Sequence, residues 1–114
     1  MPKQGDLVLI PIPFTDLSSH KRRPVIVISN DDYHRTASDV VVVAMTSNPD
    51  VVPFSFVLTS ADLEAGSLNR PGTVRADKIY TLAASLVVKT FGRVNKPTLE
   101  RIRSLLLDLT KVTP

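Results

Sequence analysis

Two runs of consecutive apolar residues restrict what this chain can fold into more than any other feature of the sequence. Residues 25–29 read Val-Ile-Val-Ile-Ser, and residues 39–45 read Asp-Val-Val-Val-Val-Ala-Met. Both are short, rich in β-branched side chains and without the polar alternation of a strand that has one solvated face. Each is therefore expected to be a β-strand buried on both faces. A closed or strongly curled barrel provides such cover.

The rest of the chain supplies further strands. Residues 7–10 form the first, after which Pro11 and Pro13 interrupt the strand and residues 15–19 form an exposed loop. Residues 54–58 and 72–79 are two more, and the second alternates, which leaves one side for solvent or a ligand. Residues 91–94 are a weaker candidate.

The last segment is expected to be a helix. Asn95 provides a cap and Pro97 a first-turn proline. Apolar residues then recur at helical spacing, at Leu99, Ile102, Leu105, Leu106 and Leu109. We expect this stripe to pack on the barrel, although a stripe of leucines also suits an interface. Residues 1–114 are thus predicted to be a single domain, mainly β with a C-terminal helix.

The amino-acid composition limits the classes of function that this protein can have. The 14 Lys and Arg exceed the 11 Asp and Glu, and residues 61–114 hold nine of the cations against five acids. Such a bias permits a polyanionic partner but is weaker than the basic stripe of a dedicated DNA-binding module. The absence of Cys excludes disulfides, thiolate zinc sites and a cysteine nucleophile. No apolar stretch is long enough to cross a bilayer or serve as a signal core, so a cytoplasmic protein is expected.

Three cations stand at the start of the first buried run. Lys21, Arg22 and Arg23 precede Pro24 and the strand behind it. A guanidinium fixed to a rigid strand can hold a phosphate at a set distance. A solvated loop face is the ordinary alternative for such a run.

A second group of polar residues suits the same chemistry. Arg75 and Asp77 lie two apart on a predicted strand, so their side chains should leave one face while Ala76 turns inward. A carboxylate and a cation together suit proton transfer and charge neutralisation at a phosphodiester, although such a pair can also be purely structural. Thr46 and Ser47 end the second apolar run, where hydroxyls can bond a phosphate or a 2′-OH.

The remaining polar candidates are less informative. His20 lies three residues before Arg23, whereas His34 beside Arg35 has the pattern of loop surface. Asp31 and Asp32 are expected to form a turn, and no further oxygen ligands are spaced for a metal site. Neither a metal nor another cofactor is predicted.

These pieces, in this order, resemble the MazF/PemK (Kid) family of toxins from bacterial toxin–antitoxin pairs. The resemblance runs from Gly5 to the last helix and rests on four blocks: residues 5–10, 23–29, 41–47 and 74–79, the last followed by Thr81. It implies an SH3-like small barrel of the CcdB/Kid type and a homodimer with an RNA groove across its interface. It also implies sequence-specific, metal-independent cleavage of single-stranded RNA, in which the 2′-OH attacks its own phosphorus and leaves a 2′,3′-cyclic phosphate.

The resemblance also assigns roles to residues. Arg23 would hold or protonate the scissile phosphate, Thr46 would bond it, and Arg75 and Asp77 would be the candidate acid and base. We expect RNA-binding roles for His20, Lys21, Arg22, Ser47 and Lys78. Many members carry a Gly-x-Glu-Gln stretch before the Arg-Pro, and here the position of that Glu is Ser18, with Asp16 and His20 as the nearest polar residues.

The partners implied are single-stranded RNA and a cognate antitoxin whose disordered acidic tail occupies the same basic groove. DNA would be reached only indirectly, through the antitoxin complex, and no membrane is involved. Two other functions are compatible with the same architecture. One is a toxin of the CcdB type that poisons a DNA gyrase by protein contact, and the other is a non-catalytic barrel that binds RNA or a partner.

Overall fold

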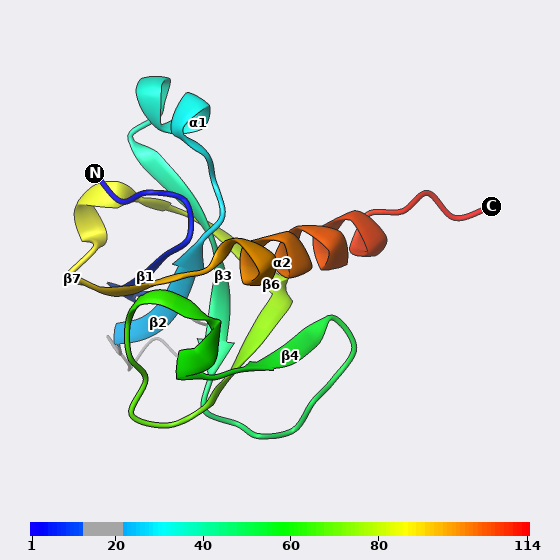
Figure 1. Cartoon of the computed structure of the whole chain (residues 1–114). Helices are drawn as coiled ribbons and strands as arrows, with labels where there is room; N and C mark the ends of the chain where they lie inside the picture. The colour runs from blue at the N-terminus through cyan, green and yellow to red at the C-terminus, as the bar shows by residue number, and fades with distance from the viewer. Residues whose placement is uncertain (13–21) are drawn as a thin grey trace.

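One antiparallel sheet of seven strands organises the molecule, which is described by a computed structural model for residues 1–12 and 22–114 (Figure 1). The strands are β1 (Asp6–Pro11), β2 (Arg22–Val27), β3 (Asp39–Thr46), β4 (Ser55–Leu58), β5 (Leu63–Gly66), β6 (Gly72–Ala83) and β7 (Lys89–Val94). Their order across the sheet is β4-β6-β3-β2-β1-β7-β5. The sheet curls into a partial barrel, as the apolar runs predicted.

The sheet is covered on both faces, which explains the uninterrupted apolar runs. One core cluster consists of Leu7, Ile26, Val43, Met45, Phe56, Leu58, Val74, Val94 and Ile102. The other consists of Val8, Ile10, Ile12, Val25, Val27, Val40 and Val42. Sequence neighbours such as Val25 and Ile26 belong to different clusters, because alternate residues of a strand point to opposite faces. Both are fully buried.

The helix α2 (Lys96–Leu109) covers the first of these faces, and the residues after it extend away from the sheet (Figure 1). Its predicted cap is confirmed, since the Asn95 side chain accepts from the backbone N–H of Thr98 at 2.9 Å. Ile102 is fully buried, whereas Leu109 is 36% exposed, so the expectation that Leu109 packs in the core is wrong. In the described part of the chain, no helix is long and apolar enough to cross a membrane.

Three local expectations differ from the structure. Asp31 and Asp32 form the first turn of a short helix, α1 (Asp31–Thr36), rather than an isolated turn, because Asn30 caps it by accepting from the Tyr33 N–H. His34 lies on this helix, with Nε2 2.6 Å from the Ser29 hydroxyl. Pro11 is still part of β1, where it pairs with Arg22. The short 3₁₀ turns η1 (Ser60–Asp62) and η2 (Ala84–Leu86) complete the fold.

A bulge in β6 shapes the region of the predicted chemistry. The β3–β6 pairing runs regularly up to Val43 with Ile79 and resumes at Ala44 with Arg75. Residues 76–78 are therefore extra on the β6 side. Bulges of this kind redirect side chains and are common beside active sites. Here the bulge carries Asp77 and Lys78, both exposed.

Candidate active site

The strand β2 begins with the two arginines that the sequence singled out. Arg22 pairs with Pro11, and Arg23 pairs with Ile10 of β1. On the other side of β2, Val25 pairs with Ala44 of β3. If that antiparallel register is continued by two residues toward the start of β2, Arg23 lies opposite Thr46 of β3. The two side chains are then on the same face of the sheet. Arg23 is half-buried, so the paired strands hold its backbone while its side chain remains accessible.

Thr46 is the last residue of β3. Its Oγ1 accepts a hydrogen bond from the backbone N–H of Asn48 at 3.2 Å. A threonine hydroxyl has one hydrogen to donate. Because the bond from Asn48 uses the oxygen only as an acceptor, that hydrogen is available for a phosphate oxygen. Ser47 follows as an exposed residue.

Arg75 and Asp77 make a two-pronged ion pair. The Arg75 Nε donates to Asp77 Oδ1 at 2.9 Å, and Nη2 donates to Oδ2 at 2.8 Å. Ala76 between them is fully buried, which confirms that the pair shares one side of the strand. The bonds from Arg75 lower the pKa of the Asp77 carboxyl and raise the pKa of Arg75. Both groups are therefore charged at neutral pH.

These groups meet at a hollow of about 300 Å³. Four of the predicted site residues line it: Arg23, Thr46, Arg75 and Lys78. Asp77 is not among the lining residues but is bonded to Arg75, which is, and Asp50 is the carboxylate that lines the hollow itself. Two cationic guanidinium groups and a hydroxyl on one concave surface can bind a phosphodiester, and the carboxylate bonded to Arg75 can accept a proton from a ribose hydroxyl beside it.

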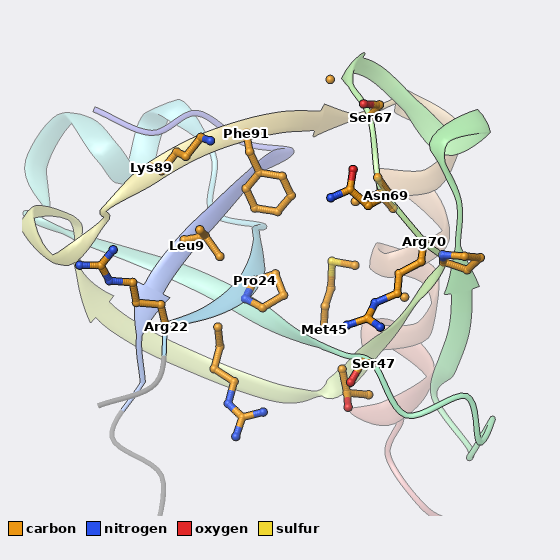
Figure 2. Close-up of a pocket in the computed structure, with 16 residues that line it drawn as sticks. Leu9, Arg22, Pro24, Met45, Ser47, Ser67, Asn69, Arg70, Lys89 and Phe91 are labelled. Atoms are coloured by element: carbon orange, nitrogen blue, oxygen red, sulfur yellow. The ribbon is translucent and has the colours of Figure 1, made fainter. Parts of the chain in front are cut away.

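A larger hollow, of about 820 Å³, adjoins the first (Figure 2). The two share Arg23, Met45 and Thr46 as lining residues. The larger one also contains Arg22 and Ser47, which were predicted to bind RNA, so six predicted residues line one continuous concave region, and Asp77 is bonded to one of them. His20 and Lys21, together with Asp16 and Ser18, lie outside the described residues.

Sequence reasoning missed the far wall of the larger hollow. Arg70 comes from the segment between β5 and β6, and Lys89 and Phe91 come from β7. The excess of cations after residue 60 is the only sequence signal for Arg70 and Lys89, and Phe91 has none. Within residues 1–12 and 22–114, no group of three or more His, Asp or Glu side chains is arranged to hold a metal ion.

Comparison with known proteins gives a consistent result for the fold. An endoribonuclease from a mycobacterial species superposes with a TM-score of 0.75 at 25% identity, over 99% of this chain and 95% of that one. A MazE–MazF complex from Deinococcus radiodurans gives 0.77 at 24% identity, over 98% of both chains. A mycobacterial endoribonuclease in complex with its cognate antitoxin gives 0.75 at 23%, over the whole of both. No curated protein matches the sequence.

The family itself follows from the sequence. A model of the family described as "PemK-like, MazF-like toxin of type II toxin-antitoxin system" matches residues 3–110, which is nearly the whole chain. The half-barrel sheet with its C-terminal helix is the fold of the structures above. The chain belongs to the PemK-like, MazF-like toxins of type II toxin–antitoxin systems.

Proposed function

We propose that this toxin is a sequence-specific endoribonuclease that cleaves single-stranded RNA without a metal ion and leaves a 2′,3′-cyclic phosphate and a 5′-hydroxyl. The observation that carries the proposal is the convergence of Arg23, Thr46 and Arg75 on one hollow, with Asp77 bonded to Arg75. Family membership and the endoribonuclease relatives support the reaction class.

The proposed chemistry divides the work between cations and one carboxylate. Arg23 and Arg75 hold the scissile phosphate and neutralise the charge that grows on its oxygens in the transition state. The Thr46 hydroxyl donates a further hydrogen bond to the phosphate. Asp77 accepts the proton of the attacking 2′-OH as the new O–P bond forms. The bond to O5′ breaks, and water protonates that oxygen.

The roles of Arg75 and Asp77 follow from their charges. Arginine does not lose its proton in proteins, and the pKa of Arg75 is raised further by Asp77, so Arg75 acts as a cation and not as an acid. Asp77 is ionised and can act as a base from the start of the reaction. Its lowered pKa makes it a weak base, so proton transfer accompanies attack and does not precede it.

The same concave region suits an inhibitor of the opposite charge. The described residues that line the larger hollow include four cations, Arg22, Arg23, Arg70 and Lys89, and no carboxylate. An acidic antitoxin tail that occupies it would exclude RNA by competition. We further propose that the toxin is a homodimer whose RNA groove crosses the subunit interface, and that it contacts DNA only through its antitoxin complex.

The experiment that tests the activity is incubation of purified toxin with a mixed RNA in EDTA. We expect cleavage at a limited set of sequences, and a fall of at least a hundredfold in rate for Arg23→Ala. Arg103→Ala on the exposed side of α2 is the control, since it removes the same charge away from both hollows. Intact RNA together with inhibition of DNA gyrase would instead support a CcdB-type poison, and intact RNA that is bound would support a non-catalytic barrel.

A further inference from the structure

The larger hollow has an apolar floor formed by neighbouring strands. Leu9 of β1 pairs with Pro24 of β2 on one side and with Lys89 of β7 on the other. Met45 of β3 continues the same row and is 5% exposed. These side chains make a continuous apolar patch, because their strands are neighbours in the sheet. Such a surface cannot hydrogen-bond a phosphate, so it must serve another part of a ligand.

Phe91 stands over this floor. Its ring points into the hollow between Leu9 and the segment 66–72, and it is half-buried (Figure 2). Among the described residues that line the hollow, Phe91 is the only aromatic one. The ring packs in part against the core cluster that contains Leu7 and Ile26, and a half-buried aromatic ring that lines a hollow can serve as a stacking surface for a nucleobase. Aromatic residues make up only 5% of the chain, and there is no Trp, so an open ring in this position is unusual here.

Cations lie on both sides of the ring. The Arg70 side chain reaches inward from the wall opposite Leu9, and Lys89 lies beside Phe91 on β7 (Figure 2). Both residues are exposed, and neither belongs to any ion pair formed within residues 1–12 and 22–114. Polar groups that suit base edges, Ser67 and Asn69, line the same wall. The volume of about 820 Å³ is in the range of sites for small organic ligands.

From this arrangement we infer that the larger hollow is a nucleotide subsite that neighbours the cleavage site: one unpaired base stacks on Phe91 over the Leu9–Pro24–Met45 floor, and Arg70 and Lys89 bind the flanking phosphates. The inference rests on the proposed function for the identity of the ligand as RNA. Because Arg23 and Thr46 belong to both hollows, the base in this subsite lies next to the scissile phosphate. Phe91 and Arg70 then contribute to the affinity for RNA rather than to the chemical step, because stacking and phosphate contacts accept any base.

An acidic peptide is the alternative occupant of the larger hollow, since it carries negative charge as RNA does. The hollow favours the nucleotide because its apolar floor and aromatic ring suit a base, while Arg70 and Lys89 line the same hollow and can bind the phosphates on either side of that base.

The test uses a short fluorescent RNA that contains a cleaved sequence, with 2′-deoxyribose at the cleaved position so that it binds without reacting. A series of these RNAs carries one abasic nucleotide at each position in turn. Stacking of one base on an aromatic ring corresponds to roughly a five- to hundredfold change in affinity. We expect one abasic position near the cleavage site to weaken wild-type binding by that factor. Phe91→Leu should weaken binding of the intact RNA equally, and the abasic penalty should then disappear.

Two further variants make the test independent of any packing defect in Phe91→Leu, whose fold is checked by thermal melting. Arg70→Gln changes an exposed residue, and it should reduce the slope of log Kd against log salt concentration by about 0.7, the contribution of one phosphate contact to single strands. Arg103→Gln, on the exposed face of α2, should leave that slope unchanged.

Several results would overturn the inference. An abasic penalty that persists in folded Phe91→Leu, or equal salt slopes for Arg70→Gln and Arg103→Gln, would each do so. If Phe91→Leu and Arg70→Gln left the RNA affinity unchanged but weakened binding of a fluorescent acidic peptide, the hollow would be assigned to a protein partner. Failure of the proposed function gives a different pattern. The wild type would then leave RNA uncut, but one abasic position would still weaken its binding to the wild type and not to Phe91→Leu.

Discussion

Asp77→Asn separates a catalytic role of this residue from a structural one. The substitution keeps the shape of the side chain, and its remaining oxygen can still accept one of the two bonds from Arg75, now at 2.8 and 2.9 Å. It removes the charge and the ability to take up a proton. A lost general base reduces the rate by about 10² to 10⁴. The stability contributed by a partly exposed ion pair is only about 1 kcal/mol or less, so the variant should remain folded.

Although Asp77→Asn should lower the rate of cleavage, it should leave RNA affinity unchanged or increase it. Removal of a carboxylate beside a phosphate site releases Arg75 for the ligand and takes away a repulsive charge, so binding should be unchanged or up to about threefold tighter. The assay compares single-turnover cleavage with the affinity for an RNA blocked by 2′-deoxyribose at the cleaved position. Asp108→Asn on α2 is the charge-matched control. An equal loss of cleavage and of affinity, or no loss of either, would refute the assignment of Asp77 as the base.

The pH dependence gives a second check on the same residue. The folded-state pKa of Asp77 lies below the ordinary value of 3.8, because Arg75 stabilises the ionised form. The ion pair therefore contributes its full stability above the unfolded-state pKa, and this contribution is lost as pH falls through the folded-state pKa. Cleavage should show no acid limb from Asp77 between pH 5 and 7. An acid limb that is centred near neutral pH and is absent from Asp77→Asn would contradict this account.

Three further predictions concern the frame that holds the site. Arg93→Ala should lower the free energy of unfolding measured in urea titrations, because the buried Asp6 carboxylate would keep the Lys3 N–H at 2.8 Å but lose the Arg93 Nε at 3.0 Å; an unchanged free energy of unfolding would contradict the role given to this pair. Gly66→Ala should destabilise the β5–β7 pairing, because Gly66 has φ +80° and an added Cβ would overlap the Phe91 carbonyl; unchanged amide exchange in β7 would show otherwise. Asn95→Ala should cost about 1 kcal/mol, and Asn95→Ser should recover most of it, as measured by thermal melting; an equal loss in both variants would exclude the cap as the cause.

The strands and the last helix were predictable because their signals are local. The β-branched runs required burial on two faces, and residues of the 25–29 run do divide between the two core clusters. The helix α1 was missed because six residues are too few to show a period, and its cap residue Asn30 was not recognised. The strand β5, Leu-Glu-Ala-Gly, contains no β-branched or aromatic residue, so only its pairing with β7 identifies it.

The site was predictable where its residues follow one another on a strand and not where the fold brings distant segments together. The Arg75–Asp77 pair needs only strand alternation, and the position of Thr46 needs only the end of an apolar run. The convergence of Arg23 with Arg75 depends on the order of β2, β3 and β6 in the sheet and on the bulge between them. Arg70 and Phe91 come from separate segments, and no sequence pattern links them to the site.

The most direct measurement of the central claim is the chemical identity of the ends produced from one defined RNA in EDTA, determined by mass spectrometry for the wild type and for Arg23→Ala. The account predicts that the wild type leaves a 2′,3′-cyclic phosphate on one fragment and a 5′-hydroxyl on the other, and that these products fall at least a hundredfold in the variant. Fragments with 3′-hydroxyl and 5′-phosphate ends, or cyclic phosphate products formed at the same rate by both proteins, would contradict it.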